Sequence, residues 1–256
     1  MTQVTPAELA CAEELALVCG GDTLLLWAAQ GMRRGVRAWA LGEAVVVASP
    51  DLNRRDRLTV GGPAGRAADL LGEVLPRVAP SYRLMGERAL IEELAGRVPG
   101  VEPAGVFEWM DTASPPPPAA GRAAGGAVGR PRWLSGADQE VSDLLAEASP
   151  SAWAVPGVAG IRRWAGIRAP GGRLVAAAAD AWSCPQVGFV AGVATAVAHR
   201  GRGYGERLCR FVFDELAAAH GRVALMVDTD NVAAIGVYER LGMRGRSLAV
   251  SALPGA

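Results

Sequence analysis

The pattern of apolar and polar positions in the C-terminal half of the chain predicts a strand, a loop and a helix in succession. Residues 187–198 form an apolar run without a charged side chain, which is typical of a strand buried on both faces, although a buried helix segment has the same pattern. From Leu208, apolar residues return at Phe211, Val212 and Leu216 with charged residues between them, as in an amphipathic helix. The glycine-rich residues 200–205 therefore lie where a strand enters the N-terminus of a helix.

The segments around this loop predict more of the same architecture. Residues 223–227 are an apolar run that indicates a second buried strand, and Asn231 is suited to cap a helix that ends at Gly242. Upstream, a helix is predicted to end at Ala148 and two strands to be joined by the glycine turn at 170–172. With the run before the loop, these strands make three antiparallel strands, at residues 161–168, 174–182 and 189–197.

The N-terminal half has a similar order of elements. Thr5 and Pro6 have the residue types of a helix start, and we expect that helix to end near Gly20. A tight hairpin is expected at Gly42-Glu43, and residues 61–78 combine a glycine-containing turn with an amphipathic helix. Strands are predicted at residues 23–28, 38–41, 44–48, 58–60, 82–85 and 106–110, and a further helix at 87–97. Two interpretations stay open: a duplicated fold that has lost its chemistry, and an unrelated α/β packing domain.

A segment rich in proline, glycine and alanine separates the two halves. Four consecutive prolines at residues 115–118 exclude a helix and favour a stiff, extended chain, whereas the glycine and alanine that follow favour flexibility. We therefore predict a first domain over residues 1–111, a linker over 112–131 and a second domain over 132–256.

Composition and charge narrow the classes of function. The chain has 256 residues, of which 50% are hydrophobic and 20% charged, and its 26 basic and 26 acidic residues give a net charge of zero. Because nucleic-acid binders carry a basic surplus or stripe, no nucleic-acid partner is expected.

The N-terminus lacks the basic start of a signal peptide, and no apolar segment approaches the roughly 20 residues that span a bilayer. We expect a soluble cytoplasmic protein without a membrane partner. The four cysteines form no ligand cluster, so no metal is expected.

Three kinds of phosphate-binding loop compete for residues 200–205. A Walker loop requires a lysine, and the chain contains none. A dinucleotide-binding fingerprint requires a third glycine where Glu206 stands, although Asp228 is placed about where a ribose-binding acid would be. The third pattern, Arg/Gln-x-x-Gly-x-Gly/Ala, is met by Arg200, Gly203 and Gly205.

Together with Asn231, Ala234 and Tyr238 on the following helix, this loop resembles the GNAT superfamily of acyl-CoA-dependent N-acyltransferases. The resemblance covers roughly residues 132–256, with motif-level similarity over 193–243. It implies an α/β (α+β) fold in which a mixed, mainly antiparallel, twisted sheet is flanked by helices, and with the N-terminal half it implies two tandem GNAT-like domains.

The resemblance also implies a function and a set of site residues. The protein would be an N-acetyltransferase that uses acetyl-CoA, or another acyl-CoA, as co-substrate and transfers the acyl group directly to an amine. Tyr238 would be the catalytic general acid, which protonates the leaving thiolate. The cofactor-binding residues would be Val193, Ala194 and Thr195 beside the pantetheine arm, Arg200, Gly201, Arg202, Gly203, Tyr204 and Gly205 around the pyrophosphate, and Asn231 and Ala234 on the next helix.

Several points stay open at this stage. Many relatives carry a glutamate on the strand before the loop, but residues 189–197 contain no carboxylate. The alternatives for the base are Asp180, which could simply face solvent, Asp228 and His199. Removal of the proton through water or by a residue of the N-terminal half is equally open. Trp164 and Trp182 are either core residues or the lining of an acceptor pocket. A small-molecule amine is the preferred acceptor, and the oligomeric state, a dimer included, is open. Alternative functions are a non-catalytic acyl-CoA-binding regulatory module and an NAD(P)-binding oxidoreductase.

Overall fold

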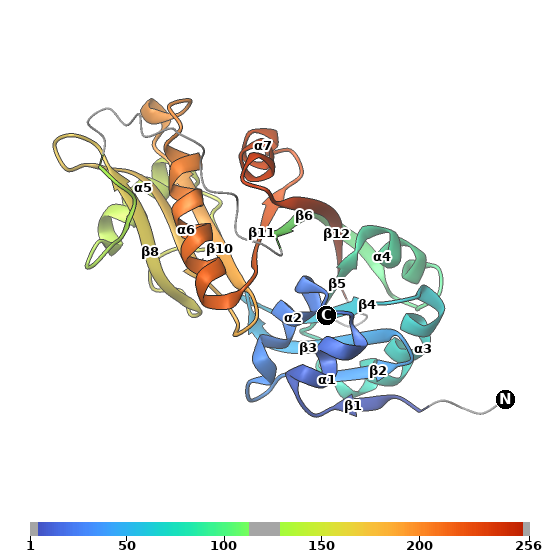
Figure 1. Ribbon diagram of the computed structural model, residues 1–256. Helices are drawn as coiled ribbons and strands as arrows, with labels where there is room; N and C mark the ends of the chain where they lie inside the picture. The colour runs from blue at the N-terminus through green and yellow to red at the C-terminus, as the bar shows by residue number, and fades with distance from the viewer. Residues whose placement is uncertain (1–4, 113–128, 253–256) are drawn as a thin grey trace. The chain divides into compact units, whose positions relative to one another are not determined.

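The computed structural model describes residues 5–112 and 129–252, so most of the predicted linker lies outside the described residues. The described chain divides into two compact units, each with helices and strands (Figure 1). Unit 1 contains residues 5–109, 184–186 and 246–252, and unit 2 contains residues 110–112, 129–183 and 187–245. Each unit is thus assembled from segments that are distant in the sequence.

In unit 1, a mixed sheet has the strand order β1-β2-β3-β4-β5-β12-β6. Strands β1 to β4 pair antiparallel in sequence order, β4 and β5 pair parallel, and β5 and β12 pair antiparallel. The strands are β1 (Ala7–Leu9), β2 (Arg37–Leu41), β3 (Ala44–Leu52), β4 (Arg55–Gly61), β5 (Arg83–Glu87), β6 (Glu102–Thr112) and β12 (Arg244–Ala252), and the helices are α1 (Ala12–Val18), α2 (Thr23–Ala29), α3 (Ala64–Val74) and α4 (Arg88–Ala95). Helix α3 connects the parallel strands β4 and β5 and corresponds to the amphipathic helix predicted after the glycine-containing turn.

The core of unit 1 lies between one face of its sheet and the apolar sides of α3 and α4. From α3, Leu70 and Leu71 are fully buried, and from α4 Ile91 is fully buried, against Leu58 and Leu84 of the sheet. Because these side chains recur at helical spacing on α3 and α4 and at alternate positions on the strands, the sequence pattern alone predicts which face each element buries.

Two predictions in unit 1 are wrong. Residues 7–9 form strand β1, in register Ala7 to Ala40 of β2, and helix α1 begins only at Ala12. Residues 23–28 form helix α2 instead of a strand, with the Asp22 carboxylate accepting from the Leu25 N–H at 3.0 Å as a helix cap. Since Leu24 to Ala29 are all buried, the run has no polar side to reveal a period, and the cap at Asp22 is the signal that identifies the helix.

In unit 2, the sheet has the strand order β11-β10-β9-β8-β7, antiparallel except for the parallel pair of β10 and β11. The strands are β7 (Arg132–Trp133), β8 (Ile161–Arg168), β9 (Leu174–Ala181), β10 (Gly188–Thr195) and β11 (Val223–Asp228), and the helices are α5 (Asp138–Ala148), α6 (Tyr204–His220) and α7 (Val232–Arg240). The helices and strands predicted for the C-terminal half are confirmed, whereas β7 and β12 were not foreseen.

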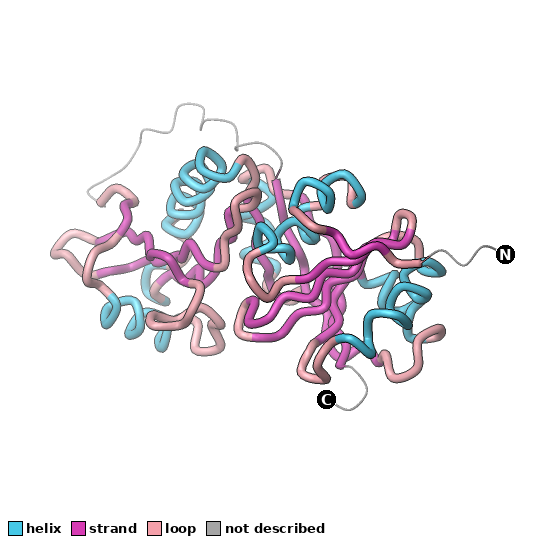
Figure 2. The backbone as a smooth tube through the Cα atoms, turned by 90° about the horizontal axis from the view of Figure 1, so that it is seen from below, coloured by secondary structure: helices cyan, strands magenta, loops and turns pink. Residues whose placement is uncertain are grey.

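Helices α5 and α6 both pack on strands β9 and β10, and Figure 2 shows helices on both faces of this sheet. The predicted fold class, a mixed α/β arrangement of a twisted sheet flanked by helices, is confirmed. The β3–β4–α3–β5 order of unit 1 parallels the β9–β10–α6–β11 order of unit 2, an antiparallel pair followed by a parallel pair joined through a helix. Within residues 5–112 and 129–252, no helix combines the length and the apolar character that a membrane span requires.

Candidate functional site

The parallel strands β10 and β11 pair over only part of their length. Their register runs from Gly188 opposite Val223 to Val190 opposite Leu225 and does not continue beyond that point. On its other side, β10 shifts register against β9 between Ala191 and Ala194. Strand β9 still pairs with Ala191, Ala194 and Thr195, but β11 no longer pairs with β10 beyond Val190. The backbone N–H and C=O groups that β10 directs away from β9 over residues 191–195 are therefore available to bond a ligand as an added strand would.

A glycine at this interruption is required by its surroundings. Gly192 has φ +61°, and a Cβ built on it would lie 2.6 Å from Cη2 of Trp164 and 3.2 Å from Cβ of Ala154. The ring of Trp164, only 5% exposed, therefore packs directly against the backbone of β10. Trp182 is also buried, and its indole Nε1 donates to the Ala159 carbonyl at 3.0 Å. Both indoles thus have packing roles.

The loop after β10 opens toward solvent at two glycines. Gly201 and Gly203 have φ values of +71° and +75°, and no heavy atom lies within 4 Å of a Cβ built on either. Gly203 is the N-cap of α6 and provides no side chain to bond the first-turn N–H groups. These donors and the positive end of the helix dipole therefore face an unobstructed space that is suited to a phosphate.

The two arginines of the loop have different environments. The Arg200 guanidinium donates to the carbonyl oxygens of Thr195 at 3.3 Å and Ala148 at 2.8 Å, which ties the loop to the end of β10 and to α5. Arg202 is exposed. Arg200 thus fixes the position of the loop, and Arg202 is placed to attract an anion from solvent.

Helix α7 carries the second half of the sequence motif. The Asn231 side chain accepts from the Ala234 N–H at 3.2 Å and caps the helix, as the sequence predicted. Tyr238 is buried at 5% exposure, with its ring 6.2 Å from the ring of Phe213 on α6. Burial raises the pKa of Tyr238 well above the usual value of a phenol, so the hydroxyl keeps its proton at physiological pH.

The thiol closest to this chemistry is inert. Burial, followed by the charge of Glu206, raises the pKa of Cys209 to about 12, so the group stays a neutral thiol and does not act as a nucleophile. Among the residues that the structure describes, no group of three or more histidine, cysteine, aspartate or glutamate side chains could hold a metal ion.

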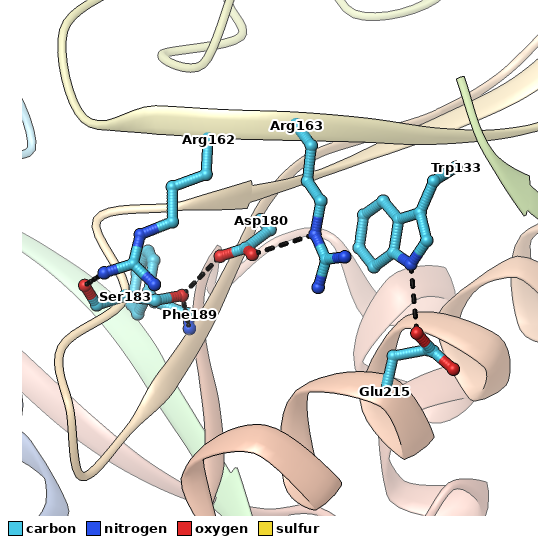
Figure 3. A network of polar contacts seen from close by, with 7 residues as sticks. All are labelled: Trp133, Arg162, Arg163, Asp180, Ser183, Phe189 and Glu215. Atoms are coloured by element: carbon cyan, nitrogen blue, oxygen red, sulfur yellow. Dashed lines mark hydrogen bonds and ion pairs between the residues drawn. The ribbon is translucent and has the colours of Figure 1, made fainter. Parts of the chain in front are cut away.

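The carboxylate of Asp180 belongs to a buried polar network, shown in Figure 3. It accepts from Ser183 Oγ at 2.6 Å and from Arg163 Nε at 3.2 Å, while Ser183 Oγ accepts from the Phe189 N–H at 2.8 Å. The interpretation that Asp180 faces solvent is wrong, since the residue is only 2% exposed. The network joins β8, β9 and β10 near the start of the parallel pair of β10 and β11. Asp228, at the end of β11, is not part of this network and its side chain is exposed.

We expect Asp180→Ala to lower the free energy of unfolding by about 1–3 kcal/mol, because the hydroxyl of Ser183 and the guanidinium of Arg163 lose a buried acceptor. Urea denaturation of the variant measures the change. Asp230→Ala, which removes an exposed carboxylate from the same unit, is the control and should change stability by less than about 0.5 kcal/mol. Equal stabilities of the two variants would contradict a structural role for Asp180.

The sequence did not reveal one pair of residues in this region. Arg240 at the end of α7 donates through Nε and Nη2 to Oε2 of Glu206 in the first turn of α6, both at 3.1 Å. The two residues are 34 positions apart and no local pattern links them. Of the two residues, only Glu206 stands out in the sequence, because a dinucleotide-binding fingerprint would have glycine at its position.

Comparison with known protein families finds a match for part of the chain. Residues 140–243 match the family model described as the acetyltransferase (GNAT) family. No curated protein matches the sequence.

Solved structures of similar fold cover nearly the whole chain. A Drosophila protein aligns with a TM-score of 0.60 at 13% identity over 99% of this chain and 100% of its own. A GCN5-related N-acetyltransferase from Kribbella flavida aligns with a TM-score of 0.54 at 19% identity over 89% of this chain and 93% of its own. At these identities the similarity establishes the fold alone.

Proposed function

We propose that this protein is an N-acyltransferase that moves an acetyl or other short acyl group from acyl-CoA to the amine of a small molecule, and the match of residues 140–243 to the GNAT acetyltransferase family model supports the proposal. The observation that carries the proposal is the continuous series of the β10 edge that β11 leaves uncovered, the open glycine loop and the N-terminus of α6. A long, flexible cofactor with amides along its arm and a pyrophosphate behind them matches this order of backbone groups and helix dipole.

The space beside Gly201 and Gly203 is not occupied by other heavy atoms and leaves room for a phosphate group. Backbone groups of Val193, Ala194 and Thr195 would bond the pantetheine amides as an added strand does. The first-turn amides of α6, from Tyr204 onward, would hold the pyrophosphate across Gly201 and Gly203, where no Cβ intervenes. Bound acyl-CoA supplies the activated thioester, and the chain supplies its orientation.

The chain contributes two further groups to the chemistry. A backbone N–H of the segment 193–195 would polarise the thioester carbonyl by donating to its oxygen, where negative charge develops. Tyr238 would donate its proton to the departing sulfur, and its raised pKa ensures that the proton is present. The amine loses its proton to water or to an exposed group such as Asp228, since Asp180 is occupied in the buried network.

The zero net charge of the chain offers no overall electrostatic attraction to nucleic acid or to an anionic membrane, and a small-molecule amine is the acceptor in this proposal.

The test is thermal unfolding of the full chain with acetyl-CoA, free CoA, NAD and NADP in parallel. A ligand that binds only the folded state raises the melting temperature, by several degrees at about 100 times its Kd. We expect both CoA species to stabilise the protein and the nicotinamide nucleotides to leave it unchanged. Stabilisation by NAD or NADP without an effect of CoA would contradict the proposal. If the CoA species stabilise the protein as expected, CoA release in a screen of amines identifies the acceptor.

A further inference from the structure

The first turn of α6 carries a negative charge where the proposed function needs a positive field. Glu206 is the third residue of α6, next to the amides that would hold the pyrophosphate. Its carboxylate is favourable for the helix itself, because it interacts with the positive end of the dipole. The same carboxylate opposes the approach of a diphosphate to that end, since like charges repel in a half-exposed site.

Arg240 neutralises this carboxylate from the neighbouring helix. Its guanidinium donates through two nitrogens to one oxygen of Glu206, each at 3.1 Å. The side chain reaches that position by running back along α7, because its Nη1 would lie 3.5 Å from a Cβ built on Gly236. That distance is an ordinary van der Waals contact, so the guanidinium lies alongside the preceding turn of α7.

We propose that Arg240 is a positioning residue that shields the pyrophosphate of acyl-CoA from the charge of Glu206. This inference rests on the proposed function of the same loop. The shield acts through Glu206 and not by direct contact with the ligand, so the benefit of Arg240 exists only while Glu206 is charged. Its effect falls on cofactor affinity and leaves the chemical step unchanged.

A double-mutant cycle tests the shield, with the Kd for free CoA measured by calorimetry at low salt. We expect Arg240→Ala to weaken binding about fivefold to twentyfold, in line with the loss of a single nearby charge interaction. Glu206→Gln should bind at least as tightly as the unmodified protein. The double variant should return to within about twofold of Glu206→Gln, because the charge that Arg240 shields is gone.

A second ion pair of the same unit provides the matched control. Arg173 Nη2 lies 3.1 Å from Glu147 Oε2, at an exposed position on the turn before β9 and the last turn of α5. Arg173→Ala and Glu147→Gln remove the same chemical groups away from the loop and should leave the Kd unchanged. The difference between Arg240→Ala and the unmodified protein should shrink at about 1 M salt, where exposed charges are screened over roughly 3 Å.

Each other outcome overturns the inference. A double variant as weak as Arg240→Ala would mean that Arg240 contacts the phosphates directly, and an unchanged Kd in Arg240→Ala would mean that Glu206 needs no shield. Either result leaves the proposed function intact, since the unmodified protein still binds CoA. Absence of CoA binding by the unmodified protein would contradict the proposed function and the shield together.

Discussion

Replacing Tyr238 by phenylalanine is expected to lower kcat by about 10²-fold to 10⁴-fold, the usual contribution of a positioned general acid. The substitution removes only the hydroxyl from a ring that is buried against Phe213, so the helix packing is retained. Because Tyr238 acts on the leaving sulfur and not on the pyrophosphate, the Kd for acetyl-CoA should change by less than about twofold. Steady-state kinetics with an amine acceptor, together with calorimetry, measures both quantities.

The control for this variant lies in the other unit. Tyr82→Phe removes the same hydroxyl from a half-buried tyrosine of unit 1 and should leave kcat unchanged. If Tyr238→Phe also retains full turnover, the proton reaches the thiolate by another route and Tyr238 is a packing residue.

The pH dependence of turnover follows from the same pKa. A general acid works while it is protonated, so the activity that depends on it is present below its pKa and lost above it. Burial raises the pKa of Tyr238 above that of an exposed phenol. We therefore expect a pH profile of kcat without a decline below about pH 10 from this group. A decline with an apparent pKa near 8 that disappears in Tyr238→Phe would contradict the direction of the shift.

The local structure that the sequence predicted correctly around the loop and α7 depends on local signals. Gly203 marks the N-cap of α6 because its φ of +75° favours glycine, and Asn231 marks the start of α7 because its side chain accepts from the Ala234 N–H. The wrong prediction at residues 23–28 has the opposite cause. That segment is buried on all sides, so the burial that stabilises helix α2 also removes the polar positions that would reveal its period.

Features that depend on distant pairing were not predictable from the sequence. The separation of β10 from β11 after Val190 is a matter of register between strands that are joined through a whole helix. Likewise, Arg200 was expected to bind phosphate, but its guanidinium is directed to the carbonyls of Thr195 and Ala148, the second of which is 52 residues away. The sequence shows that Arg200 brings a positive charge to the loop, but the contacts of its guanidinium are known only from the structure.

Gly203→Glu is expected to weaken acetyl-CoA binding by at least roughly 10²-fold, equivalent to about 2.7 kcal/mol. Gly203 is the N-cap of α6 with φ +75°, and a side chain there enters the open space in front of the first-turn amides. A glutamate adds a negative charge to this space, so it opposes the pyrophosphate through both volume and repulsion. Calorimetry with acetyl-CoA measures the loss of affinity.

The opposite end of the same helix offers a matched control in Gly221→Glu. Gly221 is the C-cap of α6 with φ +77° and, like Gly203, has no heavy atom within 4 Å of a built Cβ. Both variants place the same residue in a left-handed conformation, which costs about 1–2 kcal/mol, and the charge is less favourable at the C-terminal end of the dipole. The control should therefore be at least as destabilised and yet keep its affinity for acetyl-CoA. Equal affinities of the two variants would place the cofactor elsewhere, whereas loss of binding in Gly203→Glu alone would assign the pyrophosphate to the N-terminus of α6.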